Sequence, residues 1–115
     1  TTVKQLLDHA KKHKYVVGAD NDNNMENSQA IMNAASETIS PVIIQASRGD
    51  LKYTNFTKLK HLMYADFEEN PDIPVALHLE HGDTLDSVKK AIAIGFNSVM
   101  IDASQHSFEE NVRIT

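Results

Sequence analysis

Apolar and polar positions follow two different periods along the 115 residues, and their alternation predicts an α/β fold. Short apolar runs rich in β-branched residues predict strands over 15–21, 41–47, 74–81 and 98–103. Apolar side chains at three- and four-residue spacing predict helices over 1–14, 25–39, 54–69, 85–94 and 108–114. The four strand–helix units indicate a parallel sheet built from a βα repeat. This pattern leaves two folds open, a doubly wound open sheet and half of a (β/α)8 TIM barrel, which normally needs about 250 residues.

Local signals mark the boundaries of these elements. The run 41–47 is almost wholly apolar, which is typical of a strand buried on both faces. Asn23 and Asn24 predict a turn with a helix cap, and residues 48–50 predict a loop. Gly95 is expected to end the helix over 85–94, and Asp83 is expected to cap its start.

Composition narrows the classes of function. The net charge is -5 and the basic residues are dispersed, which argues against binding to nucleic acid or to anionic membranes. The chain has no cysteine, so neither disulfides nor thiol chemistry are expected. No apolar run approaches the length of a membrane span and no signal peptide is visible. We therefore expect a single cytoplasmic domain over residues 1–115.

A polar cluster follows the third and fourth predicted strands. His78, Glu80, His81 and Asp83 lie at the end of the third strand, and Asp102 lies at the end of the fourth. In parallel α/β folds the carboxyl ends of the strands face the crevice where ligands bind, so the chemistry is expected here. For His78 a hydrogen bond inside the sheet is an equal alternative to a direct role. Asp102 is equally compatible with a site acid and with a carboxylate bonded to loop amides.

Four segments taken together resemble one enzyme family. They are GADNDNNMENSQAIMNAA, SPVIIQASRG, IPVALHLEHGDT and GFNSVMIDASQHSFEENVRIT, and they cover almost the whole chain. Their order and spacing resemble the N-terminal half of class II fructose-bisphosphate aldolases. The resemblance implies half of a TIM barrel with four parallel strands and alternating helices, the last helix truncated. It also implies a divalent metal, usually zinc, and cleavage of fructose 1,6-bisphosphate into dihydroxyacetone phosphate and glyceraldehyde 3-phosphate, the metal acting as a Lewis acid.

The same resemblance assigns roles to five residues. His81 looks like the first metal-binding histidine of the family, and Glu80 occupies the place of its catalytic, proton-transferring aspartate. Asn21 and Ser47 resemble strand-end positions that contact the substrate. Asp102 resembles an acidic position near the metal.

The chain departs from the family pattern at several of these positions. Glu80 carries its carboxylate one methylene further out than aspartate, and a displacement of about 1 Å can cost on the order of 100-fold in rate. Gln105 stands where the family usually has histidine, and Asp20 and Asp22 stand where it has apolar residues.

The family's other two metal-binding histidines and its phosphate loops belong to the second half of the barrel. Catalytic zinc usually has three protein ligands, so this chain is not expected to bind zinc tightly by itself. The leading expectation is an aldolase-derived half-barrel, excised or redesigned and inactive alone. Two alternatives stay open: an aldolase segment that becomes active when a second half completes it, and a small phosphate-binding α/β module.

Strand alternation adds two structural expectations. If Asn21 points into the barrel, Asp20 and Asp22 point outward, and in a half-barrel this edge is expected to be open to water. The uncovered inward faces of residues 41–47 and 74–81 suggest a homodimer, or a complementary half-barrel, as the partner.

Overall fold

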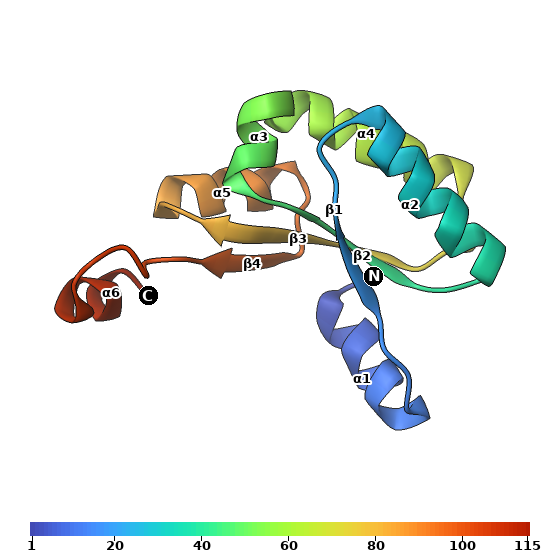
Figure 1. Cartoon of the computed structure of the whole chain (residues 1–115), viewed down its shortest axis with the longest axis horizontal. Coiled ribbons are helices and arrows are strands. Elements are labelled where there is room, and N and C mark those ends of the chain that lie inside the picture. Colours follow the sequence, from blue (N-terminus) through green and yellow to red (C-terminus); the bar gives the residue numbers. More distant parts are fainter.

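The computed structural model describes the backbone of residues 1–115 and every side chain except that of Tyr53. Figure 1 shows strands and helices alternating along the chain, as the apolar pattern predicts. The strands are β1 (Gly18–Asn21), β2 (Val42–Ala46), β3 (Val75–Gly82) and β4 (Ser98–Ile101). The helices are α1 (Val3–His13), α2 (Met25–Thr38), α3 (Arg48–Thr54), α4 (Phe56–Glu69), α5 (Leu85–Ile94) and α6 (Phe108–Ile114).

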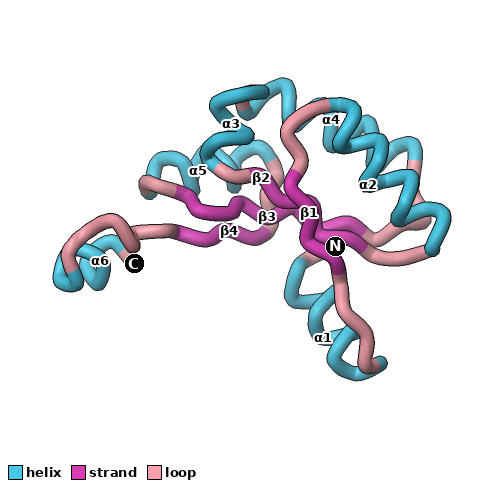
Figure 2. The backbone as a smooth tube through the Cα atoms, in the orientation of Figure 1, coloured by secondary structure: helices cyan, strands magenta, loops and turns pink.

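The order of the strands distinguishes between the two folds that the sequence leaves open. All pairings are parallel and the order in the sheet is β1-β2-β3-β4, the same as along the chain. A doubly wound sheet would reverse its order at a switch point, whereas a barrel adds each strand beside the previous one. The expected four-stranded part of a TIM barrel is therefore confirmed, with β1 and β4 as the two edges (Figure 2).

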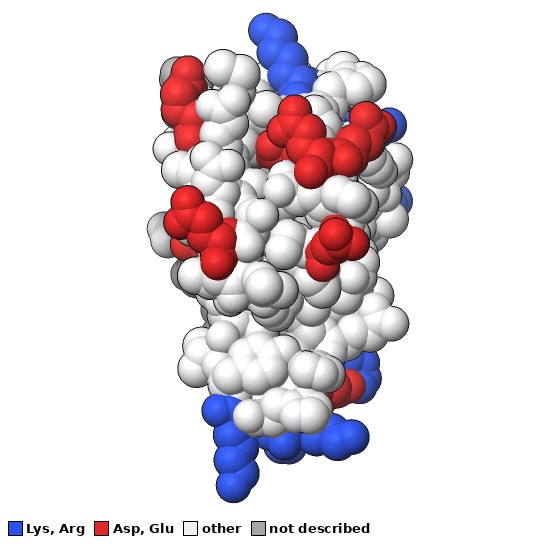
Figure 3. All heavy atoms as spheres, turned by 90° about the vertical axis from the view of Figure 1, so that its right-hand side faces the viewer, with Lys and Arg blue, Asp and Glu red and all other residues white. Residues whose placement is uncertain are grey.

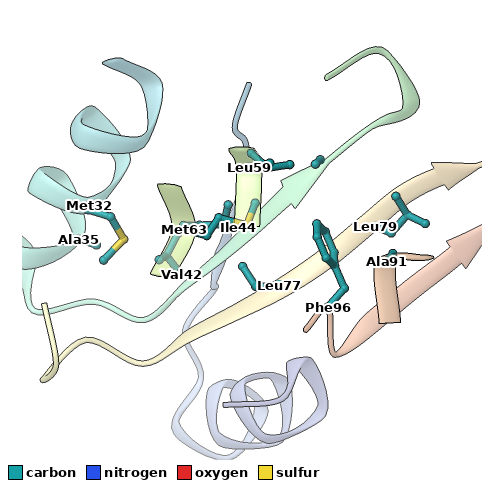
Figure 4. Close-up of a cluster of buried hydrophobic side chains, with 11 residues drawn as sticks. Met32, Ala35, Val42, Ile44, Leu59, Met63, Leu77, Leu79, Ala91 and Phe96 are labelled. Carbon is teal, nitrogen blue, oxygen red and sulfur yellow. The ribbon is translucent and has the colours of Figure 1, made fainter. Parts of the chain in front are cut away.

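The main hydrophobic core lies between the sheet and the helices that connect its strands. Ile44 and Leu79 point to this side of the sheet and are fully buried. Met32 of α2, Leu59 of α4 and Ala91 of α5 cover them (Figure 4). A buried aliphatic side chain of this size contributes about 1.5–3 kcal/mol, so this layer holds the helices on the sheet.

The opposite face of the sheet is covered only in part. α1 lies on this side, away from the other helices (Figure 1). Its Leu6 packs against Ile43 of β2 and Ala76 of β3 in a second, smaller cluster. Alternate residues of β2 thus have different partners, because successive side chains point to opposite faces. This explains why the run 41–47 is almost continuously apolar.

Two local predictions about secondary structure are wrong. Residues 48–50 do not form a loop, because α3 begins at Arg48 with Ser47 as its N-cap and Asp50 completing a capping box. Asp83 does not cap α5, since the side chain of Thr84 accepts the hydrogen bond from the Ser87 backbone N–H. The predicted C-cap at Gly95 is confirmed, with φ at 112° in the left-handed region.

The expectation for the first strand is half right. β1 is an edge strand and Asp20 is exposed. Asp22, however, is fully buried rather than open to water. The reason is that α2 and α4 pack beside each other over the end of β1 and present polar groups to this carboxylate.

Charges are unevenly distributed on the surface seen from the α2 side. In Figure 3, most acidic side chains lie in the upper and middle parts of this face and basic side chains gather at the lower end, although basic side chains also lie at the top and right edge and acidic atoms near the bottom. The last turn of α1 carries Lys11 and Lys12, whereas the first turns of α2, α5 and α6 carry acidic residues. Among the described residues, no helix has the length and apolar character needed to cross a bilayer.

Candidate active site at the strand ends

The carboxyl ends of β1, β2 and β3 are joined by side-chain hydrogen bonds. Gln45 Nε2 donates to Asn21 Oδ1 at 2.8 Å, and Asn21 Nδ2 donates to Glu80 Oε2 at 3.2 Å. The parallel register places Asn21 beside Gln45, so neighbouring strands aim these groups to the same side. The predicted site residues Asn21 and Glu80 therefore lie together. Gln45 was not predicted, and its polar side chain within an apolar strand was the available signal.

His81, near the end of β3, and Asp102, directly after β4, form a hydrogen-bonded pair. His81 Nδ1 lies 2.7 Å from Asp102 Oδ2, and His81 Nε2 lies 4.0 Å from Glu80 Oε1. Hydrogen bonds from Ser104, and then the one from His81, lower the pKa of Asp102 to about 2. Because an ionised carboxylate can only accept, His81 donates through Nδ1. In the neutral imidazole, Nε2 then carries the lone pair that can bind a ligand.

The backbone at His81 is unusual for a strand. Its φ is 51°, in the left-handed region that only a few per cent of residues other than glycine adopt. The pairing of β3 with β4 also shifts register between Leu79 and Gly82. Such irregularities re-aim side chains at strand ends and are found near functional sites. Here the irregularity coincides with the position of His81, whose imidazole contacts Asp102.

Ser47 lies at the end of β2, but Asp50 occupies its donors. The Ser47 backbone N–H and hydroxyl both donate to Asp50 Oδ2, at 2.7 and 2.8 Å. Asn21 Nδ2 approaches the same oxygen at 3.4 Å. Asp50 is thus a member of the cluster that sequence reasoning missed, although the Ser-x-x-Asp pattern at 47–50 is a capping-box signal.

The remaining candidates have structural partners. His78 Nδ1 lies 2.8 Å from Ser98 Oγ, and burial lowers the pKa of His78, which matches the alternative of a hydrogen-bonded histidine within the sheet. Asp83 accepts a hydrogen bond from Ser87, which lowers the pKa of Asp83, and its carboxylate also pairs with Arg48 at 3.0 Å.

The donor set fits one ligand of a metal ion. His81 offers a free Nε2 whose orientation is fixed through Nδ1 by a carboxylate, the arrangement common among metal-binding histidines. The described residues contain no group of three or more histidine, cysteine or acidic side chains arranged to hold a metal. These residues therefore match part of a metal site and not a complete one.

Comparisons with known proteins agree on one family. The sequence model of the family described as fructose-bisphosphate aldolase class-II matches residues 1–115. The fructose-bisphosphate aldolase of Giardia intestinalis is 60% identical over 114 residues, covering 99% of this chain and 35% of the relative. That of Geobacillus stearothermophilus is 47% identical over 116 residues, covering 99% of this chain and 40% of the relative. The chain thus spans little more than a third of the length of these relatives.

Solved structures show the same fold. The crystal structure of the YdjI aldolase from Escherichia coli superposes with a TM-score of 0.86 at 32% identity, over 99% of this chain and 44% of that one. The structure of a putative fructose-1,6-bisphosphate aldolase from Coccidioides immitis gives a TM-score of 0.83 at 28% identity, over 97% of this chain and 44% of that one. The four strands and their helices correspond to part of an aldolase barrel.

Proposed function

This chain belongs to the class II fructose-bisphosphate aldolase family, and we propose that it supplies the first part of the active site of such an aldolase. The reaction would be metal-dependent cleavage of fructose 1,6-bisphosphate into dihydroxyacetone phosphate and glyceraldehyde 3-phosphate. The observation that carries the proposal is the geometry of His81. Its Nδ1 is fixed by Asp102 while its Nε2 stays available beside Glu80.

Each residue of the cluster has a role in this proposal. Zinc or another divalent metal, when bound, would polarise the ketone of the substrate and stabilise the enediolate. His81 would provide one ligand, and Asp102 would hold its imidazole in the tautomer that leaves Nε2 unprotonated. Glu80 would move the proton of the hydroxyl on the aldehyde side, kept in position by Asn21. Asn21 and Ser47 would contact the substrate.

We also propose that residues 1–115 do not catalyse the reaction alone. Catalytic zinc usually takes three protein ligands, and the described residues contain no group of three or more side chains arranged to complete a site around His81. Helix α6 leaves Phe108 and Val112 exposed, at 79% and 63%. Such an apolar stripe suits an element that another part of the barrel, or a second copy of the chain, covers.

A chimaera tests the function directly. Residues 1–115 replace the matching segment of the Giardia intestinalis aldolase, and cleavage of fructose 1,6-bisphosphate is measured with and without added zinc. We expect zinc-dependent activity, which His81→Ala lowers by at least about 100-fold. The matched control is His61→Ala. His61 is an exposed histidine on α4 and is not part of the cluster at the strand ends. Equal activity of the two variants would contradict the role of His81.

The same chimaera tests Glu80. Glu80→Asp withdraws the carboxylate by one methylene, to the length that the family uses. A correction of about 1 Å in a proton-transferring group is worth up to about 100-fold, so the rate should rise. A fall in rate would mean that the strand end has adjusted to the longer side chain.

Native mass spectrometry of the 115-residue chain, with and without zinc, shows whether a second copy of the chain or another part of an aldolase barrel covers the apolar side chains of α6. A dimer that binds zinc would show that a second copy completes the site. A monomer without stoichiometric zinc would leave the rest of an aldolase barrel as the partner.

A further inference from the structure

A second polar cluster, of two carboxyl groups and one hydroxyl group, lies on the other side of β1, away from the candidate active site. It consists of Asp22, directly after β1, Ser28 on α2 and Asp66 on α4. Asp22 and Ser28 are completely buried and Asp66 is 5% exposed. Figure 1 shows α2 and α4 running side by side on this side of the sheet. The cluster thus joins one edge strand to two helices of the outer layer.

One hydroxyl group connects the two carboxyl groups. Ser28 Oγ lies 2.7 Å from Asp22 Oδ2 and is also hydrogen-bonded to Asp66 Oδ2. A serine hydroxyl has one hydrogen and can donate it to only one of two acceptors. The second contact becomes a hydrogen bond only if the other carboxyl group is protonated and donates to Ser28 Oγ. One additional proton in the cluster would therefore make both contacts full hydrogen bonds.

The surroundings favour keeping that proton. Asp22 Oδ1 is buried and has no hydrogen-bond partner among the described residues, which makes a full negative charge on Asp22 costly. The charged groups that act on the cluster are Asp50, from α3, on Asp22, and Glu69, further along α4, on Asp66. Both are acidic, and no basic group is among those that act on either carboxyl. Burial is the largest cause of the raised pKa values of Asp22 and Asp66, and the negative charges act in the same direction. Hydrogen bonds from Ser28 to both groups, and from the Asn24 backbone to Asp22, lower these pKa values without reversing the shift.

We propose that Asp22, Ser28 and Asp66 form a one-proton latch that fastens the end of β1 to α2 and α4 and loosens as the pH rises. When the shared proton is lost, two buried carboxylates compete for one hydroxyl hydrogen and repel each other. The proposal does not rest on the aldolase assignment, because Asp22, Ser28 and Asp66 have no assigned role in that site.

The latch also connects to the strand ends. The Asp22 backbone N–H donates to the Gln45 carbonyl at 2.9 Å, and the preceding residue, Asn21, is bonded to the side chains of Gln45 and Glu80. Loosening Asp22 therefore releases the backbone that positions Asn21. A change in the protonation of Asp22 or Asp66 is therefore expected to alter the position of the Asn21 side-chain amide, although neither carboxyl group contacts that amide.

The sign of the pH effect follows from the direction of the shifts. Between the ordinary pKa of an aspartate and the raised pKa in the folded chain, the folded state holds one proton more than the unfolded state. The stability given by the latch is complete in acid and is lost as the pH rises through the raised pKa. Within this window the equilibrium constant for unfolding increases by up to about tenfold per pH unit.

The first experiment is urea unfolding of the 115-residue chain from about pH 5 to about pH 8. Asp22→Asn places an uncharged donor where the protonated carboxyl stands, so the pH dependence should flatten, and Asp66→Asn should act in the same way. Asp20→Asn is the matched control, because Asp20 is exposed on the same strand, and it should keep the dependence of the unchanged chain. Equal pH dependence in all four proteins would overturn the proposal.

A second measurement keeps the proposal testable if a variant does not fold. Carbon-13 NMR of the carboxyl groups in the unchanged chain reports their protonation directly. One carboxyl of the pair should remain protonated at a pH above the ordinary pKa of an aspartate, and the side-chain amide signals of Asn21 should shift as it titrates. Ionisation of both Asp22 and Asp66 at that ordinary pKa would refute the latch.

Discussion

Asp22 and Asp102 occupy equivalent places at the two edges of the sheet, yet the pKa values of their carboxyl groups are shifted in opposite directions. Each follows the last residue of an edge strand, and each donates its backbone N–H to the neighbouring strand, Asp22 to Gln45 O at 2.9 Å and Asp102 to Gly82 O at 2.8 Å. Asp22 is buried with a raised pKa, whereas the pKa of Asp102 is lowered to about 2.

The number of donors and the access to water account for this difference. The side chain of Asp102 is 25% exposed and accepts hydrogen bonds from Ser104 and His81, which stabilise its charge. Asp22 shares one hydroxyl with another carboxyl and has one oxygen without a partner among the described residues. An acidic residue at a strand end therefore does not indicate a ligand site by itself. The face to which its side chain points decides whether it serves chemistry or packing.

Removing the shared hydroxyl should have the largest effect on stability. Ser28→Ala leaves two buried carboxyl groups without their common partner, so we expect a loss of about 3 kcal/mol at neutral pH. Ser36→Ala is the control on the same helix, because Ser36 is exposed, and its effect should stay within about 0.5 kcal/mol. Urea unfolding of both variants measures the difference. Similar values for the two would mean that the cluster of Asp22, Ser28 and Asp66 contributes no more than a surface position.

A substitution in the polar cluster at the strand ends should lower the stability less than Ser28→Ala does. Asp50→Ala removes the carboxylate that accepts from the Ser47 backbone and hydroxyl, so α3 loses its capping box. The loss of a cap is worth about 1 kcal/mol, because water can replace the missing acceptor at this half-buried position. The control is Asp8→Ala, which breaks only an exposed ion pair with Lys4 on α1, and should cost at most about 0.5 kcal/mol. A loss at Asp50 as large as that at Ser28 would remove the contrast between the two clusters.

The comparison also shows how far the sequence leads. The apolar runs predict all four strands, and the resemblance to class II aldolases predicts a sheet in barrel order, because these features depend on local periodicity and on matching segments. The proximity of His81 and Asp102 follows from two strands that end beside each other. Alternation along β1 correctly separates Asn21 from Asp22.

What the sequence does not predict depends on contacts between distant elements. The burial of Asp22 arises because Ser28 and Asp66, from helices separated by β2 and α3, meet over the end of β1. No local pattern contains that information. Asp50 was missed for a different reason, since its capping signal was present but residues 48–50 were interpreted as a loop.

The smallest effect on stability is expected at Asp102, and it should have the opposite pH dependence to that of the latch. Because the pKa of Asp102 is lowered in the folded chain, its contribution is present above the ordinary pKa of an aspartate and is lost as the pH falls through about 2. Asp102→Asn should therefore change unfolding only weakly, since the carboxylate is partly exposed to water. Carbon-13 NMR should show Asp102 ionised throughout the range in which the pair Asp22 and Asp66 still holds a proton. If Asp102 and that pair instead titrated together, the local donors and burial at the two edges would not control their charge, and the contrast between the edges would fail.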